Sequence, residues 1–203
     1  MPAPFRLMVV DDHPLFIEAL QLALRPVIAG VSVSSAATLA AAVERLKDAP
    51  VDLILLDLML PDAGGVEGVA RVREVCGAAR VVVVSGRDDP VTVSLVKALG
   101  ADSFISKALP LTLIQDRLRD IVAGRPVFPE AGASDAATAA AVSTLTAAQA
   151  RVLAAAATGK LNKQIAYEMN LAEPTIKAHM SAIFKKLGVN NRTQAILKLE
   201  GRG

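Results

Sequence analysis

The sequence predicts an α/β fold, in which a doubly wound, parallel, five-stranded sheet is followed by a small all-α domain. Through residue 123, short apolar strand-like runs alternate with helix-like segments, and this alternation is typical of a parallel sheet with helices on both faces. From residue 144 onward the pattern is helical, with no strand-like run. We therefore expect a first domain at 1–123, a linker at 124–142 and a helical domain at 143–203.

The elements of the first domain follow from apolar runs and from helix-end signals. Pro90 suits the first turn of a helix, and Gly100 suits the position after a helix end. The expected strands are 7–10, 31–35, 51–56, 81–84 and 103–105. The expected helices are 14–24, 39–47, 66–75, 91–99 and 110–123.

Composition indicates a globular protein, because 53% of the 203 residues are hydrophobic and 21% are charged. No apolar run reaches the length of a bilayer span, and the N-terminus lacks the pattern of a secretory signal. Cys76 is the only cysteine, which excludes an internal disulfide. Because His13 and His179 also fall in different predicted domains, we expect no zinc site. We expect a cytoplasmic protein without a membrane partner.

Charge is distributed unevenly along the chain. Residues 1–123 carry 12 Lys and Arg against 15 Asp and Glu, whereas residues 143–203 carry 9 against 3. A basic domain of this kind points to nucleic acid as a partner. A solvated basic surface would look the same, so charge alone leaves both interpretations open.

Three acids follow strand-like runs. Asp11 and Asp12 come after the first strand, and Asp57 ends the third. A sheet of order 2-1-3-4-5 makes these strands neighbours, so that their carboxyl ends meet at one edge. Mg²⁺ prefers hard oxygen ligands. The sequence therefore predicts a magnesium site, with the backbone carbonyl of Met59 within reach.

Asp57 is the candidate nucleophile, because a carboxylate can form an acyl phosphate. Lys107 and Ser85 follow the fifth and fourth strands, where an ammonium and a hydroxyl would meet phosphoryl oxygens. Taken singly, each residue is more typical of a helix cap, a turn or a solvated charge. His13 is interpreted as a helix-start residue rather than a ligand. Their coincidence at four strand ends favours the functional interpretation.

Residues 5–123 resemble the receiver domain of bacterial response regulators, which has a flavodoxin-like fold. The segments that carry the resemblance are Val9–His13, Asp57–Pro61 with Gly65, Val83–Gly86 and Gly100–Lys107. The resemblance implies that a histidine kinase phosphorylates Asp57. It also implies that Mg²⁺ binds Asp11, Asp12, Asp57 and the Met59 carbonyl, that Ser85 moves toward the phosphoryl group, and that Phe104 turns inward. From its residue type alone, Phe104 is more typical of a core residue.

The helical domain has the pattern of a helix-turn-helix. Thr146 and Gln149 form a capping-box pattern for a helix that ends near residue 159, and Asn162 is expected to cap a second helix at 163–169. A third helix is expected to start at Glu173-Pro174 and to run to Leu187, where Gly188 stops it. It has an apolar stripe and, on another face, residues at i, i+4 spacing that suit a recognition helix. The stripe is Ile176, Met180, Ile183 and Leu187; the other face is Lys177, Ser181 and Lys185. An ordinary three-helix bundle is the alternative.

Residues 143–203 resemble the LuxR-type helix-turn-helix, and the two domains together resemble the NarL/FixJ group of regulators. The segments are Leu145-Thr146, Gly159–Ala166, Thr175–His179 and Ile183–Val189 with Arg192. The resemblance implies that promoter DNA is the partner and that a helix near 193–199 supplies a homodimer contact. Base-facing residues would be Lys177, Ala178 and Ser181. Backbone-facing residues would be Asn162, Lys163, Thr175 and Lys185. His179 is expected to pack rather than to contact DNA.

The sequence thus predicts a two-component response regulator in which phosphorylation of Asp57 controls DNA binding. We expect the unphosphorylated receiver to mask part of the recognition helix, with dimers forming upon phosphorylation or on DNA. The protein is expected not to be an enzyme, and no catalytic residue is assigned. An aspartate-nucleophile phosphohydrolase is one alternative, although Met59 stands where such enzymes place a second acid. A basic domain that binds protein or RNA is another.

Overall fold

The computed structural model describes residues 4–129 and 136–200. Two compact units emerge from its backbone contacts. The first contains Met1–Asp88 and Gly100–Pro129, and the second contains Asp89–Leu99 and Glu130–Gly203.

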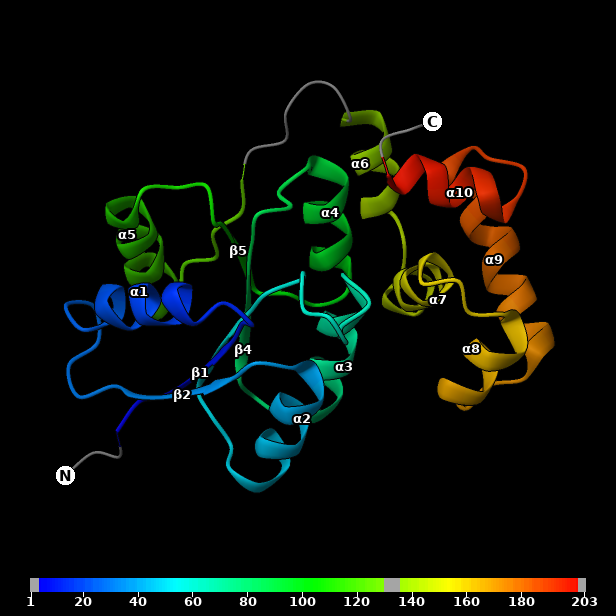
Figure 1. The fold of residues 1–203 in the computed structure, drawn as a ribbon. Coiled ribbons are helices and arrows are strands. Elements are labelled where there is room, and N and C mark those ends of the chain that lie inside the picture. Colours follow the sequence, from blue (N-terminus) through cyan, green and yellow to red (C-terminus); the bar gives the residue numbers. More distant parts are fainter. Residues whose placement is uncertain (1–3, 130–135, 201–203) are drawn as a thin grey trace. The chain divides into compact units, whose positions relative to one another are not determined.

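The first unit is built on a parallel sheet of five strands in the order β2-β1-β3-β4-β5, as predicted (Figure 1). Val10 at the end of β1 lies opposite Leu56 at the end of β3, so these two central strands finish side by side. The same edge receives the ends of β4 and β5, where Ser85 pairs with Ser106. The strands are β1 (Arg6–Val10), β2 (Ser32–Ala36), β3 (Leu53–Leu56), β4 (Arg80–Ser85) and β5 (Ser103–Ser106).

The third strand begins two residues later than the expected start at residue 51. Asp52 immediately precedes it, and its carboxylate accepts a hydrogen bond from the backbone N–H of Arg6 at 2.7 Å. An acid that binds the start of the neighbouring strand with its side chain is a strand-entry feature, which the apolar pattern does not reveal.

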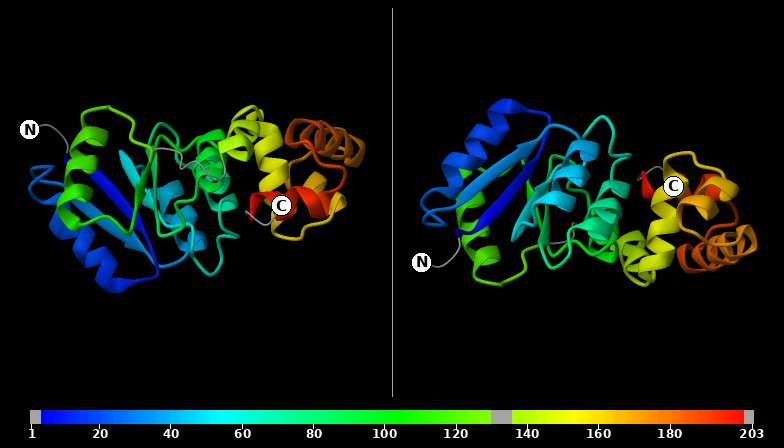
Figure 2. Two further views of the ribbon diagram at one scale, coloured as in Figure 1. Left: turned by 90° about the horizontal axis from the view of Figure 1, so that it is seen from above. Right: turned by 90° about the horizontal axis from the view of Figure 1, so that it is seen from below.

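Helices cover both faces of this sheet. Figure 2 shows α1 (Pro14–Leu24) and α5 (Leu111–Val122) together on one side, and α2 (Leu39–Asp48) and α3 (Glu67–Val75) on the other. Strands β1, β3, β4 and β5 are buried on both faces over most of their length, and their Val, Leu and Ile side chains form the core, whereas the edge strand β2 leaves Ser32 and Ser34 exposed. Leu20 and Leu24 of α1 and Leu118 of α5 pack into this core with the strand residues. This packing fixes the strand ends, which carry the candidate site.

Helix α2 receives two caps at its N-terminus. The Thr38 side chain accepts a hydrogen bond from the N–H of Ala41, and the Asp62 carboxylate accepts from the N–H groups of Leu39 and Ala40 at 2.9 Å each. Asp62 comes from the segment after β3. These two hydrogen bonds therefore fix the segment just after Asp57 to the N-terminus of α2.

The second unit is helical: α4 (Pro90–Ala98), α6 (Ala136–Ser143), α7 (Ala147–Ala157), α8 (Asn162–Glu168), α9 (Glu173–Leu187) and α10 (Arg192–Leu199). Helix α6 lies largely within the predicted linker and packs against α4. The capping box of Thr146 and Gln149 is present at α7. The expected cap at Asn162 is wrong, because Leu161 is the N-cap residue and Asn162 is the first helical residue. The Gln164 side chain accepts the Leu161 N–H there instead, at 2.7 Å.

Helices α7, α8 and α9 pack on one another through the predicted apolar stripe of α9, all four residues of which are buried. Between α8 and α9 the chain turns at Asn170, which has a positive φ of 53°. Asparagine tolerates this left-handed conformation better than most side chains. Arg192 at the start of α10 donates to the carbonyls of Ala156 and Lys160 at 2.6 Å each, which ties α10 to the α7–α8 corner. Within the described residues, every helix is too short or too polar to cross a bilayer.

The contribution of the Asp62 cap to stability should depend on pH, which allows the cap to be tested. Burial opposes ionisation of this carboxyl, but the N–H groups of Ala40 and Leu39 outweigh burial and hold its pKa below the ordinary value of 3.8. The stabilisation is therefore present above that ordinary value and is lost as the pH falls through the lowered one. We expect Asp62→Ala to cost about 1 kcal/mol of unfolding free energy at neutral pH, and less in acid, measured by urea unfolding.

Asp62→Asn is the matched control for this prediction. The amide keeps an acceptor oxygen but carries no charge, so the variant should lose less stability than Asp62→Ala and lose the pH dependence. An equal cost of Asp62→Ala at both pH values would show that the ionised carboxylate is not what stabilises α2.

Candidate functional site

Two acids are buried side by side at the carboxyl edge of the sheet. Asp11 follows β1 and Asp57 follows β3, with 1% and 2% of their surfaces exposed. The N–H of Asp57 donates to the carbonyl of Val10 at 2.9 Å, and the N–H of Asp11 donates to Ala36 at 3.0 Å. The backbone ladder thus continues one residue beyond the strands and fixes both acids in place.

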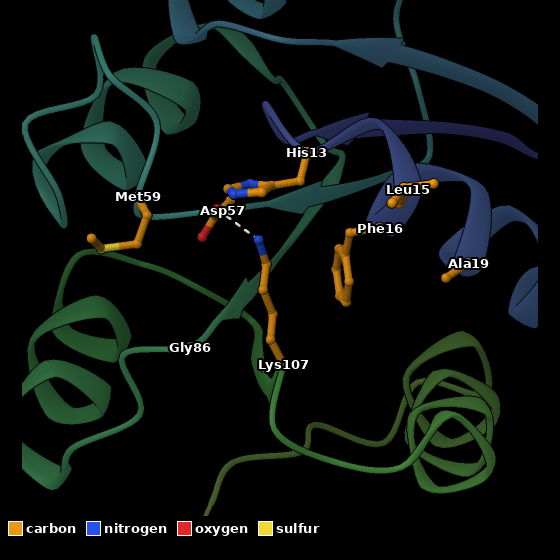
Figure 3. Close-up of a pocket in the computed structure, with 8 residues that line it drawn as sticks. All are labelled: His13, Leu15, Phe16, Ala19, Asp57, Met59, Gly86 and Lys107. Carbon is orange, nitrogen blue, oxygen red and sulfur yellow. Dashed lines mark hydrogen bonds and ion pairs between the residues drawn. The ribbon is translucent and has the colours of Figure 1, made fainter.

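Lys107 compensates the charge of both carboxylates. Its Nζ lies 2.7 Å from Asp57 Oδ2 (Figure 3). It also lies 2.7 Å from Asp11 Oδ2. Its backbone N–H donates to the carbonyl of Ser85 at 2.9 Å, so the segment after β5 is tied to the end of β4. Buried acids are costly unless they are paired, and here one ammonium serves two of them.

The aromatic ring of Phe16 also contacts the Lys107 ammonium. The Nζ atom lies 4.6 Å from the centre of the Phe16 ring, within the range of a cation–π interaction. Figure 3 shows the ring of Phe16, on α1, beside the end of the Lys107 side chain. The sequence reasoning missed Phe16, because an aromatic in the first turn of a helix is far more often a core residue than a partner of a cation.

His13 starts helix α1, as predicted, and its ring also joins the acids. It is the N-cap residue, a position that Asp12 does not occupy. The His13 N–H donates to Asp11 Oδ1 at 2.9 Å. The ring Nδ1 lies 2.8 Å from Asp12 Oδ1 and 3.2 Å from Asp11 Oδ1. The sequence placed the residue correctly but gave no signal for the direction of its side chain.

This cluster can bind a metal ion. Asp11, Asp12, His13 and Asp57 each offer one ligand atom, and these four atoms lie within 4.8 Å of one another. Asp57 Oδ1 is buried and has no hydrogen-bond partner among the described residues. A buried carboxylate oxygen without a donor is costly. Carboxylate oxygens are hard, negatively charged ligands, and these suit a hard divalent cation such as Mg²⁺.

A hollow of about 510 Å³ opens beside the acids. It is lined by Asp57 and Lys107 at its polar end and by apolar groups elsewhere, among them Phe16, Leu15 and Met59. The Met59 side chain is 60% exposed. The space gives an external group access to Asp57 from the solvent side.

Two other residues predicted for this site, Ser85 and Phe104, lie on the neighbouring strands β4 and β5. Ser85 is buried at the end of β4, where its Oγ accepts from the N–H of Arg87 at 3.3 Å. Phe104 is buried within β5, as a core interpretation predicts. Ser106, next along that strand pair, donates its hydroxyl to the Asp88 carboxylate at 2.5 Å. This bond, which the sequence did not reveal, connects the segment after β4 to the end of β5.

The face of α9 opposite its buried stripe is the candidate nucleic-acid interface. Five of the predicted contact residues on α9 are exposed: Thr175, Lys177, Ala178, Ser181 and Lys185. Lys163 on α8 is also exposed, whereas Asn162 and His179 are half-buried. Lys177 pairs with Glu173 at 2.9 Å on the surface, and Ser181 Oγ donates to the Lys177 carbonyl at 3.0 Å. An exposed ion pair is weak, so Lys177 remains available to another anion.

Comparison with known proteins assigns the chain to a family. Residues 7–119 match the model of the response regulator receiver domain, and residues 143–199 match that of bacterial regulatory proteins of the luxR family. The chain therefore belongs to the response regulator family. It is a two-component response regulator of the NarL type, with a receiver followed by a LuxR-type helix-turn-helix, and its family consists of transcriptional regulators.

Curated relatives are similar over nearly their whole length. The glycerol metabolism activator of Pseudomonas putida is 35% identical, with 95% of this chain and 94% of the relative covered. The probable transcriptional regulatory protein NarL of Mycobacterium tuberculosis is 33% identical, with 96% and 93% covered. Among solved structures, RcsB of Salmonella enterica serovar Typhimurium has a TM-score of 0.61 at 21% identity, with 99% and 100% covered, which shows a shared fold.

Removal of Lys107 tests whether it supports the two buried acids. Lys107→Met leaves Asp11 and Asp57 without a cation, and we expect it to lower the unfolding free energy by about 3 kcal/mol. Because a divalent ion can replace the lost charge, saturating Mg²⁺ should stabilise this variant more than the unchanged protein. Urea unfolding followed by circular dichroism, with and without Mg²⁺, measures both effects.

Lys47→Met is the matched control, since Lys47 pairs with Glu44 at 2.6 Å on the exposed surface of α2. Its cost should stay below about 1 kcal/mol, with no added response to Mg²⁺. A Lys107→Met protein as stable as this control would mean that the buried acids need no ammonium.

Proposed function

We propose that Asp57 accepts a phosphoryl group from the histidine of a sensor kinase and that this modification controls binding of the helix-turn-helix to promoter DNA. The observation that carries the proposal is the state of Asp57. It is a buried carboxylate with one oxygen held by Lys107, the other without a hydrogen-bond partner among the described residues, and a hollow in front of it.

The chemistry is a displacement at phosphorus. A carboxylate oxygen of Asp57 forms the new P–O bond as the P–N bond of the phosphohistidine breaks, and the released imidazole takes up a proton from water. Lys107 would compensate negative charge on the transferred phosphoryl group. Because the Lys107 ammonium already lies beside Asp57 before the transfer, no reorganisation is needed to bring it there. Mg²⁺, held by Asp11, Asp12, Asp57 and the Met59 carbonyl, would supply the remaining positive charge.

Transmission of the signal would begin at Ser85. Its hydroxyl accepts a long hydrogen bond, at 3.3 Å, from the N–H of Arg87, whereas it could donate a charge-assisted bond to a phosphoryl oxygen. Movement of Ser85 toward Asp57 would disturb the segment that follows β4. Phe104, buried in the neighbouring strand, would fill the space that Ser85 leaves.

The output would be a dimer on DNA. RcsB, which shares the fold, was solved bound to a promoter in the presence of the phosphomimetic BeF₃⁻. In this chain, we assign base contacts to Lys177, Ala178 and Ser181, and backbone contacts to Asn162, Lys163, Thr175 and Lys185. Helix α10 would supply the dimer contact, and DNA binding would place the protein in the cytoplasm. We retain 1–123, 124–142 and 143–203 as receiver, linker and DNA-binding domain.

Phosphorylation of Asp57 is tested by mass spectrometry. We expect acetyl phosphate and Mg²⁺ to label one site, and peptide mapping to place the label on Asp57. Asp57→Asn removes the nucleophile and should abolish labelling. Asp62→Asn, in the segment just after Asp57, should be labelled normally, because its side chain caps α2 instead. Full labelling of Asp57→Asn would contradict the assignment.

DNA binding is tested at Lys177. Loss of a base contact should weaken binding of a promoter duplex by about 1–3 kcal/mol in Lys177→Ala, measured by fluorescence anisotropy. Lys47→Ala, an exposed lysine on the receiver, should bind normally. Beryllofluoride with Mg²⁺ should strengthen binding of the unchanged protein. If affinity responds neither to the Lys177 substitution nor to beryllofluoride, the proposed output is wrong.

A further inference from the structure

We propose that His13 supplies an imidazole nitrogen to the cation site of Asp11, Asp12 and Asp57. The site would then hold first-row transition divalents such as Mn²⁺ more tightly, relative to Mg²⁺, than its oxygen ligands alone could. This inference rests on the proposed cation site, but it concerns a ligand that the phosphorylation chemistry does not require.

The distances within the cluster fit one coordination shell. Neighbouring ligands of an octahedral ion at about 2.1 Å lie about 3.0 Å apart. His13 Nδ1 lies 2.8 Å from Asp12 Oδ1 and 3.2 Å from Asp11 Oδ1, which brackets this spacing. The farthest pair of the four ligand atoms is within 4.8 Å, which a small contraction would bring into a single shell. His13 is therefore placed as a neighbouring ligand would be.

The carboxylate oxygens are divided between two cations. Lys107 takes Asp11 Oδ2 and Asp57 Oδ2. The Oδ1 atoms are not bound by Lys107: that of Asp57 has no hydrogen-bond partner among the described residues, and that of Asp11 lies 3.2 Å from His13 Nδ1. The unpartnered oxygen of Asp57 is an observation independent of the acidic cluster itself, since that carboxylate is almost fully buried. A buried carboxylate oxygen without a donor favours a cation beside Asp57 Oδ1, and the His13 ring nitrogen belongs to the same group of ligand atoms within 4.8 Å.

The local backbone directs the ring to this place. His13 has extended φ and ψ of −100° and 100° at the N-cap of α1, and its N–H is held by Asp11 Oδ1 at 2.9 Å. This bond fixes the Cα next to the acids. The ring is 66% exposed, so it can turn by the small amount that coordination requires without displacing core residues.

The competing role is a hydrogen bond from Nδ1–H to Asp12, which would orient a ligand without touching the ion. The two roles differ in metal preference. Imidazole is a good ligand for transition metals, whereas Mg²⁺ favours oxygen. A coordinating ring strengthens Mn²⁺ binding selectively, while a ring that only orients Asp12 strengthens both ions alike.

Electron spin echo spectroscopy of bound Mn²⁺ tests coordination directly, because it detects a ¹⁴N nucleus attached to the ion. The full chain without an affinity tag contains two histidines, His13 and His179. His179→Ala is therefore the matched control. We expect imidazole ¹⁴N modulation in the unchanged protein and in His179→Ala, and its loss in His13→Ala and in His13→Asn. Asparagine suits the N-cap position that His13 occupies without a side-chain cap bond, so the second variant should not weaken the start of α1.

Titration calorimetry of the same proteins gives the second readout. We expect Mn²⁺ affinity to fall about tenfold in both His13 variants, with Mg²⁺ affinity changed less than about twofold because Mg²⁺ does not use the nitrogen. Mn²⁺ bound without ¹⁴N modulation, or equal losses for both ions, would overturn the inference. Labelling of Asp57 by acetyl phosphate and Mg²⁺ would still support the proposed function in that event. A nitrogen signal without labelling would overturn the function instead.

Discussion

One ammonium between two buried carboxylates is the interaction on which the candidate site depends. The parallel ladder forces Asp11 and Asp57 together, because β1 and β3 are adjacent and end in register. Two like charges in so dry a place would repel each other, and Lys107 makes the arrangement tolerable by binding one oxygen of each. Phe16 stabilises the ammonium from its free side. The fold therefore keeps charged side chains almost fully buried at a position where they can take part in a reaction.

The same arrangement explains how a small covalent change can have a structural effect. Lys107 is tied through its backbone to Ser85, and Ser106 is tied through its side chain to Asp88. The ends of β4 and β5 are thus linked both to the charge at Asp57 and to each other. A phosphoryl group on Asp57 would change the charge that Lys107 must balance, and we expect the linked segments to respond first. Polar bonds at the strand ends can rearrange in this way, whereas the close-packed strand interiors cannot.

Much of this could be predicted from the sequence, for identifiable reasons. The strands are short apolar runs separated by helices, so their order and parallel pairing follow from general rules, and the acids at their ends are placed with them. Local pattern is weaker at boundaries: Leu161 rather than Asn162 caps α8, and β3 starts at Leu53. Contacts that depend on side-chain direction were not accessible. The Phe16 ring lies against the Lys107 ammonium, and the His13 ring lies beside Asp12. Both contacts depend on how the side chains at the start of α1 pack, which residue spacing in the sequence does not predict.

We propose that one edge of the sheet holds two cations: the Lys107 ammonium, on the Oδ2 atoms of the carboxylates, and a metal ion on their Oδ1 atoms. Anomalous diffraction from crystals soaked in Mn²⁺ tests this most directly. We expect a single strong peak bounded by the Oδ1 atoms of Asp11 and Asp57, with Lys107 Nζ still on the Oδ2 atoms. A peak elsewhere on the receiver, or a Lys107 side chain expelled into solvent when the metal binds, would contradict it.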